Sequence, residues 1–187
     1  MRPRRHHRLR RSRSTPPPPN VSIVLPQDSP ITVDAHTGPP CTVVTTPDGA
    51  KVDGDESTVK MNVQGKSDTS VVLTGMRVIV EKRSQPAGSV MGCHGIPADR
   101  EFTMDLDQPF TPVLAQWGSE HNAPAPPVSL PLTVTAQDTE ILNLTASTQT
   151  GDCTWAIELS WSANGRSGIY RIPSTGAPYR TIATGGL

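Results

Sequence analysis

The sequence predicts an all-β fold, an antiparallel β-sandwich of immunoglobulin-like or jelly-roll-like type. Twenty prolines and fifteen glycines among 187 residues imply many turns and short strands rather than helices. Alternation of apolar and polar residues, which is typical of strands with one buried face, recurs along the chain. The clearest segment, residues 153–172, combines this alternation with a specific turn. We therefore expect about ten short strands in two packed sheets.

Residues 153–172 predict one β-hairpin. The loop is Asn164-Gly165, a pair that suits a type I′ turn because both central residues need positive φ. This loop sets four facing pairs: Ile157 with Ile172, Leu159 with Tyr170, Trp161 with Gly168 and, on the opposite face, Glu158 with Arg171. A shift of one residue would lose both the apolar pairs and the charge pair.

The first half of the chain predicts six further strands. Two short ones are bounded by prolines, as edge strands often are, and the third is followed by the turn residues Pro47-Asp48-Gly49. The other three show apolar residues at every second position, with a turn at residues 65–68. In chain order these strands are 21–25, 31–35, 41–46, 58–64, 70–73 and 76–83.

The second half predicts a long loop and then further strands. Residues 84–100 hold five prolines and glycines and are expected to be the loop. Residues 101–107 alternate cleanly, with Phe102, Met104 and Leu106 inward. Prolines interrupt residues 109–131, where Trp117 is expected to close one end of the core. The remaining strands are 130–136, 140–147 and 179–183.

The formal net charge of zero conceals a basic tail on an acidic body. After residue 13 the chain has ten lysines and arginines against seventeen acids. Residues 15–19 form a Pro-rich spacer, so residues 1–20 are expected to be a disordered tail and residues 21–187 a β-sandwich domain. Seven arginines make the tail basic: Arg2, Arg4, Arg5, Arg8, Arg10, Arg11 and Arg13.

The tail has two interpretations. It could bind phosphates of nucleic acid weakly and without sequence specificity, or lie on an anionic surface, through its arginines. It could equally be an unstructured leader that results from an incorrectly chosen start codon. The absence of interleaved aromatic residues gives no support to sequence-specific recognition.

The three cysteines allow one disulfide with one thiol left over, or three free thiols. If a bridge exists, Cys93 with Cys153 is preferred, because both fall where a loop meets a strand. The adjacent Cys93-His94 pair matches no zinc pattern. A calcium site and an acidic loop are both compatible with four neighbouring acids, Asp48, Asp53, Asp55 and Glu56. Neither metal nor cofactor is expected.

Catalysis is not expected either. Asp105 and Asp107 point the same way from one strand and could form an acid and base pair, but a solvated strand face explains them as well. The serines of the hairpin, Ser160, Ser162 and Ser167, have no GxSxG elbow, and His36, His94 and His121 stand in no fixed relation to them.

A resemblance covers roughly residues 70–183. It rests on residues of the middle segment and of the C-terminal run: Arg83, Pro86, Gly88, Gly92, Phe102, Asp105, Asp107, Pro109, then Asp152-Cys153, Trp155, Leu159, Trp161, Gly165, Arg166, Gly168, Pro178, Arg180 and Thr181. These resemble a β-rich domain of unknown function found in uncharacterised actinobacterial (Streptomyces-type) proteins. There the domain follows a helix-turn-helix or membrane-anchoring part, whereas this chain has only the basic tail, which suggests truncation. The resemblance implies no activity, ligand or catalytic residue.

The leading hypothesis is a non-catalytic β-sandwich, a binding or accessory module for an unidentified macromolecular partner. Its positive support is apolar residues on otherwise polar faces, Ile79 and Ile169, although a neighbouring loop could cover either one. The alternative is a nucleic-acid-associated protein that acts through the tail. The sequence shows no signal peptide and no transmembrane segment, so a cytoplasmic location is the default expectation.

Overall fold

The computed structural model describes residues 21–92, 102–108, 113–115, 118–120, 123–125 and 129–187. These residues form fifteen strands and one 3₁₀ turn, η1 (Pro26–Asp28). The expected all-β sandwich is thereby confirmed for the described part of the chain. The basic tail of residues 1–20 lies outside the described residues, as do Cys93, His94, Trp117 and His121.

The first sheet has five strands in the order β1, β4, β12, β7, β8. Its neighbours are antiparallel except for β12 and β7, which run parallel. The strands are β1 (Ile31–Thr37), β4 (Glu56–Gly65), β12 (Thr139–Ser147), β7 (Phe102–Asp105) and β8 (Leu114–Ala115).

The second sheet has eight strands built around the long strand β13. One edge of β13 pairs with β5, while its other edge pairs with β15 and then with β14. A parallel pairing of β15 with β3 extends the sheet to β2 and β6. The strands are β11 (Leu132–Val134), β5 (Val71–Ser84), β13 (Asp152–Ala163), β14 (Arg166–Ile172), β15 (Tyr179–Ile182), β3 (Lys51–Gly54), β2 (Val43–Thr45) and β6 (Ser89–Met91).

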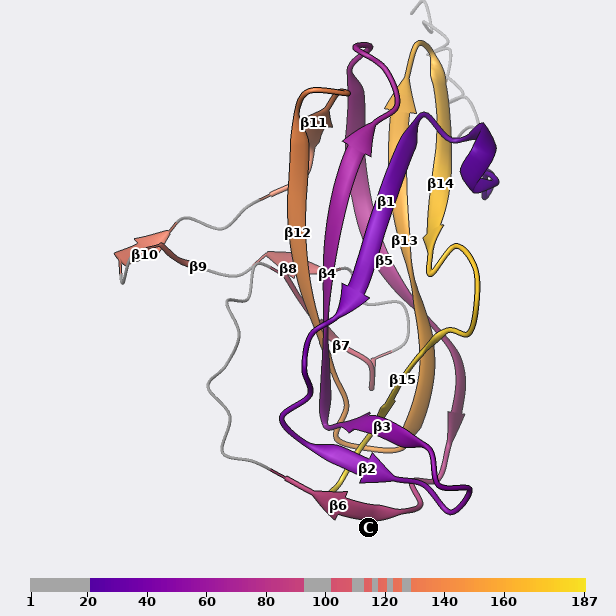
Figure 1. Cartoon of the computed structure of the whole chain (residues 1–187), viewed down its shortest axis with the longest axis vertical. Coiled ribbons are helices and arrows are strands. Elements are labelled where there is room, and N and C mark those ends of the chain that lie inside the picture. The colour runs from indigo at the N-terminus through magenta and orange to yellow at the C-terminus, as the bar shows by residue number, and fades with distance from the viewer. Residues whose placement is uncertain (1–20, 93–101, 109–112, 116–117, 121–122, 126–128) are drawn as a thin grey trace, which may run out of the picture.

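The two sheets face each other along most of the molecule, with β1, β4 and β12 in front of β5, β13 and β14 (Figure 1). Strands β2, β3 and β6 lie across the lower end, and a separate small hairpin comprises β9 (Gly118–Glu120) and β10 (Ala123–Ala125). The core between the sheets contains the predicted inward residues, among them Val59, Met61, Val63, Phe102, Met104, Leu106, Trp155, Ile157, Leu159 and Trp161.

The predicted hairpin is confirmed residue by residue. Strands β13 and β14 pair in the expected register throughout, from Ile157 opposite Ile172 to Ala163 opposite Arg166. Asn164 and Gly165 have φ values of 49° and 72°, as a type I′ turn requires. The hairpin therefore forms from information contained in about twenty consecutive residues.

Four local predictions need correction, and one of them is the long loop expected at residues 84–100, which contains strand β6. The two strands expected at 70–73 and 76–83 are one strand, β5, in which a bulge opposite Ser160 and Trp161 switches the inward face. The acidic segment expected to be a loop contains strand β3. Residues 21–25 make only one isolated bridge, Ile23 with Ile169, rather than a strand.

The expected cysteine pairing is wrong. Cys153 is a free thiol, fully buried on the inner side of β13, whereas Cys41 is disulfide-bonded. Burial raises the pKa of the Cys153 thiol, an effect that a weak hydrogen bond to Thr148 only partly offsets. Cys153 acts as a small apolar core residue.

Candidate functional site

The acidic residues considered for calcium are engaged in separate structural contacts. Asp48 accepts a hydrogen bond from Thr46 within its turn, and this bond lowers the pKa of its carboxyl group. Asp55 accepts two hydrogen bonds from Thr184, at 2.7 and 2.8 Å. In the part of the chain that the structure describes, no three His, Cys, Asp or Glu side chains are grouped as metal ligands would be.

A buried chain of hydroxyls connects the two sheets near Asp53. Ser57 lies 2.6 Å from Thr181, oxygen to oxygen, and the Trp155 indole N–H donates to the Thr181 hydroxyl at 2.9 Å. Burial raises the pKa of Asp53, and a hydrogen bond with Ser57 partly opposes that rise. These contacts satisfy polar groups that would otherwise be unpaired in the core, so their role is structural.

The sequence suggested a solvated strand face for Asp107, but in the structure its carboxylate is engaged in hydrogen bonds. It accepts hydrogen bonds from Arg83, Thr148 and Thr150 at 2.8–2.9 Å and from the backbone N–H of Gln149 at 2.7 Å. Burial raises the pKa of Asp107, but these hydrogen bonds together lower it below the ordinary value. Asp107 therefore connects the end of β7 to the turn between β12 and β13.

The predicted charge pair on the outer face of the hairpin is present, with a third partner. Glu158 is 4% exposed and lies 3.4 Å from Arg171, but its shorter contact is 2.6 Å, to Arg77 on β5. Arg171 also pairs with Glu81. The serines of the hairpin line the same outer face, and His36 is exposed on β1, so among the described residues the structure brings no serine and histidine together there.

The apolar residues thought to be exposed are covered. Ile169 is 7% exposed because residues 22–24 cross it with two backbone hydrogen bonds, and Ile79 is half-buried. The covering segment itself exposes Val21, Ile23 and Leu25, at 41%, 55% and 60%, and strand β6 exposes Val90 and Met91, at 46% and 77%.

A cleft between the open edges of the two sheets is a candidate ligand site, although it is smaller than other cavities of the described structure. Strand β1 forms one wall, β14 the other, and the segment after β14 forms a rim. The cavity has a volume of about 200 Å³ and is lined by Val33, Asp34, Ala35, Tyr170, Ile172, Pro173, Ser174, Thr175 and Tyr179. We call it the tyrosine cleft, because both tyrosines of the chain line it.

Tyr170 is held rigidly in this cleft. It faces Leu159 across the hairpin and is 5% exposed, yet its hydroxyl makes no hydrogen bond to any described residue. Within the described chain, Trp161 Nε1 is the one fully buried side-chain nitrogen or oxygen that lacks a partner. The Tyr170 hydroxyl also lacks a partner but is not among the fully buried atoms, and Tyr170 is one of the residues that line the cleft.

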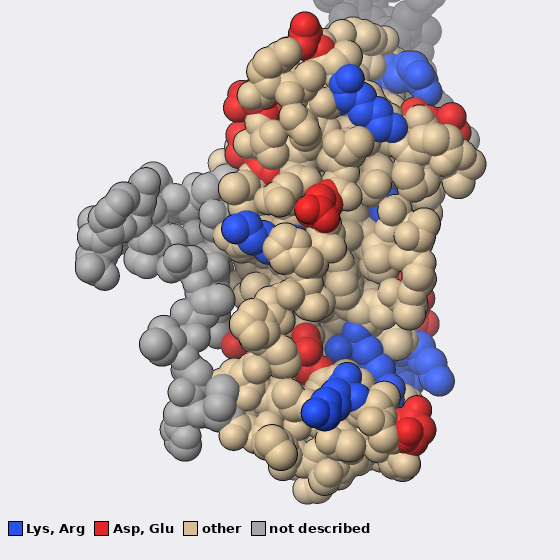
Figure 2. Space-filling view, in the orientation of Figure 1, with Lys and Arg blue, Asp and Glu red and all other residues tan. Residues whose placement is uncertain are grey.

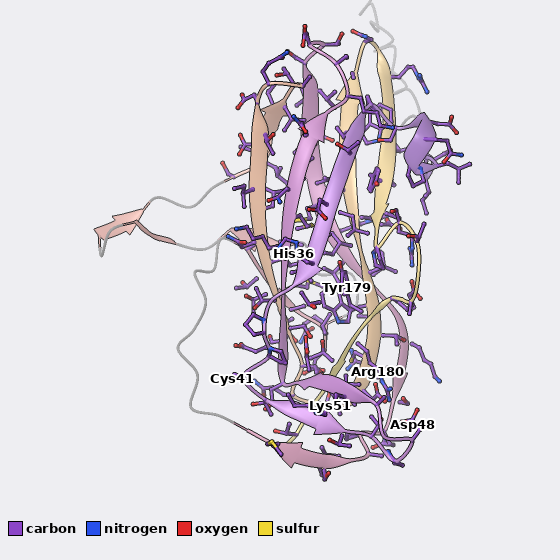
Figure 3. All side chains as sticks on the ribbon, in the orientation of Figure 1. His36, Cys41, Asp48, Lys51, Tyr179 and Arg180 are labelled. Atoms are coloured by element: carbon purple, nitrogen blue, oxygen red, sulfur yellow. The ribbon has the colours of Figure 1, made fainter. Side chains whose placement is uncertain are left out.

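Tyr179 completes the cleft from the start of β15. Its ring packs against Trp155 with centroids 4.8 Å apart, and burial raises the pKa of its hydroxyl, which stays protonated at neutral pH. Figure 3 places Tyr179 in the middle of the body, above Arg180, Lys51 and Asp48 at the lower end. Arg180 lies away from the cleft and forms a bidentate pair with Asp152, at 2.8 and 2.6 Å.

The residues that line the cleft include few charged ones. On the face drawn in Figure 2, Lys and Arg gather over the lower end and also lie near the upper end, with acidic side chains between them. Of the described residues that line the cleft, none is Lys, Arg or His. An anionic ligand would therefore find no cationic partner in the cleft.

Fold and site together define the class of this protein: a β-sandwich with a small cleft at its open side, lined in part by Tyr, Ser and Thr residues. Comparison with known proteins finds no family, no curated protein and no solved structure that matches the chain. The resemblance to the actinobacterial β-rich domain stays a prediction. No helix of the described residues is long and apolar enough to cross a membrane.

Sequence reasoning missed the tyrosine cleft. The hairpin register placed Tyr170 on the inner face, and residues 179–183 were expected to be a strand, but nothing in the sequence indicated that β1 would lie opposite both tyrosines. The scarcity of aromatic residues, seven in the chain, was the only available signal.

Proposed function

We propose that this chain is a non-catalytic binding module and that the tyrosine cleft is its binding site. The observation that carries the proposal is the Tyr170 hydroxyl, which belongs to a side chain only 5% exposed and has no hydrogen-bond partner in the described structure. Buried polar groups in folded proteins are normally paired with protein or with ordered water. A site that keeps such a group accessible can offer it to a ligand.

The frame of the cleft suits binding without large rearrangement. Tyr170 is fixed by the β13–β14 register, and Tyr179 by its contact with the fully buried Trp155. Among the described strands, β1 pairs on one side only, so its other edge carries main-chain groups that no described strand bonds and that a ligand could use. Preorganised groups of this kind bind with a smaller entropy cost.

The test uses the fact that the chain has only two tyrosines. Protein labelled with ¹³C in the tyrosine rings gives two sets of ring signals, which Tyr170→Phe and Tyr179→Phe assign. In a screen of a diverse fragment library, we expect several fragments to shift both sets of signals in a saturable way. A library that shifts neither set would contradict the cleft as a binding site.

We also propose, as the second function, weak binding of nucleic-acid phosphates through the seven tail arginines. Its support is the charge separation between the tail and a body with ten basic and seventeen acidic residues. Binding to a DNA duplex should weaken steeply with salt, by about 0.9 in log K per log unit for each phosphate neutralised. A full-length variant with glutamine at all seven positions should lose this binding. If the variant still binds the duplex, the tail is not the binding element.

The cysteines support a proposal about compartment. Disulfides persist in oxidising environments and are rare in the cytosol. The disulfide bond at Cys41 therefore favours an oxidising compartment over the cytoplasmic location expected from the sequence. Thiol labelling of the protein in intact cells, before lysis, checks this: Cys41 should resist labelling until a reductant is added.

A further inference from the structure

Most of the polar residues that line the tyrosine cleft carry a neutral hydroxyl. They are Tyr170, Tyr179, Ser174 and Thr175, and each hydroxyl can both donate and accept a hydrogen bond. The free edge of β1 adds neutral main-chain donors and acceptors. The cleft therefore presents a mixed set of uncharged hydrogen-bonding groups.

The one charged residue that lines the cleft, Asp34, directs its carboxylate elsewhere. Its neighbours Val33 and Ala35 pack against the core, and successive side chains of a strand point to opposite faces. Asp34 is exposed, so its carboxylate lies on the outer face of the first sheet. A cationic ligand would thus find no carboxylate inside the cleft, just as an anion would find no cation.

Apolar surface surrounds these hydroxyls. Ile172 and Pro173 line the cleft together with the two tyrosine rings. Tyrosine combines an apolar ring with a polar tip, and therefore suits a ligand that carries C–H surface and hydroxyls side by side. The volume of about 200 Å³ is below the range of drug-sized ligand pockets and limits the bound group to a small molecule or one unit of a longer one.

We infer that the tyrosine cleft binds a neutral, hydroxyl-rich ligand the size of one sugar ring. This inference rests on the proposed function and names the chemical class of its ligand. A pyranose offers hydroxyls that donate and accept around its edge and C–H groups on its faces, which matches the two kinds of surface in the cleft. A single ring has few atoms, so the affinity is expected to be about millimolar.

The experiment titrates the ¹³C-tyrosine-labelled full chain with eight probes. Four are neutral, D-glucose, D-galactose, D-mannose and N-acetyl-D-glucosamine. Four are charged, D-glucuronate, D-glucosamine hydrochloride, inorganic phosphate and tetramethylammonium chloride. We expect at least one neutral sugar to shift the signals of both tyrosines saturably. D-glucuronate and D-glucosamine, which keep the ring but carry charge, should bind more weakly than that sugar.

Two variants test whether the tyrosine hydroxyls recognise the sugar or whether the sugar only contacts the rings. Tyr170→Phe and Tyr179→Phe keep the rings and remove one hydroxyl each, and either should weaken sugar binding about threefold to tenfold, followed through the tyrosine that remains. Ser167→Ala, on the outer face of β14, is the matched control and should bind as the wild type does. Thermal unfolding of each variant verifies that it is folded.

The outcomes distinguish this inference from the proposed function. If only charged probes shift the tyrosine signals, the cleft binds ligands but the inferred class is wrong. If fragments of the library shift them and no sugar does, the inference fails and the proposed function stands. If neither fragments nor sugars shift them, both fail. Equal sugar binding by the wild type and both phenylalanine variants would also overturn the inference.

Discussion

Gly168 and Trp161 lie so close together that the stability change caused by a substitution at Gly168 depends on the residue at position 161. Trp161 is 2% exposed, and a Cβ added at Gly168 would lie 2.6 Å from its ring carbon Cζ2. Gly168→Ala should therefore destabilise the wild type by about 1 to 3 kcal/mol through overpacking. Trp161→Ala should cost about 3 to 5 kcal/mol through the lost burial and the cavity it leaves.

The two substitutions together should cost less than the sum of their separate effects. Once the indole is gone, the new methyl group meets only Val24, so Gly168→Ala should cost clearly less than it does in the wild type. The coupling free energy is expected to be about 1 to 3 kcal/mol. The methyl of Val24 lies as close to the added Cβ as the indole does, at 2.6 Å, so Val24→Ala should also relieve part of the cost of Gly168→Ala.

The assay is urea unfolding of the two single variants and the double variant, followed by circular dichroism. Gly75→Ala is the matched control, because an added Cβ there meets Ser160 at an ordinary 3.9 Å and should change the stability by less than about 1 kcal/mol. Additive effects of Gly168→Ala and Trp161→Ala would refute the reasoning, since they would mean that the two residues do not share one space.

Three further predictions concern charged and reactive groups. Asp107→Asn should cost about 2 to 3 kcal/mol at pH 7; because the folded-state pKa is lowered, the difference from wild type should shrink as the pH falls below about 4, measured by urea unfolding across that range. Arg77→Met should destabilise by about 1 kcal/mol, because Arg77 makes the shorter of the two contacts with the buried Glu158, at 2.6 Å against 3.4 Å for Arg171; unchanged stability in the same assay would be evidence against this role of Arg77. Cys153 should resist iodoacetamide at pH 8 in the native protein and react on unfolding without reductant, as mass spectrometry of its peptide would show; rapid native labelling would exclude its burial.

The sequence by itself determined the β class of the fold, the hairpin and much of the core. The register of β13 and β14 follows from two local requirements, positive φ at Asn164-Gly165 and a single apolar face, and both act between residues close in the chain. The inward residues of β4 and β7 were identified in the same way, because side chains alternate along any strand.

Only the tertiary structure decided which separate segments meet. The parallel pairing of β15 with β3, the hydrogen bonds to Asp107 and the cover that residues 22–24 form over Ile169 join residues far apart in sequence. Periodicity says which face of a strand is buried, but not which strand it is buried against. The free Cys153 and the tyrosine cleft depend on that choice. Contacts of this kind are selected by the packing of the whole core, in which many weak interactions act together.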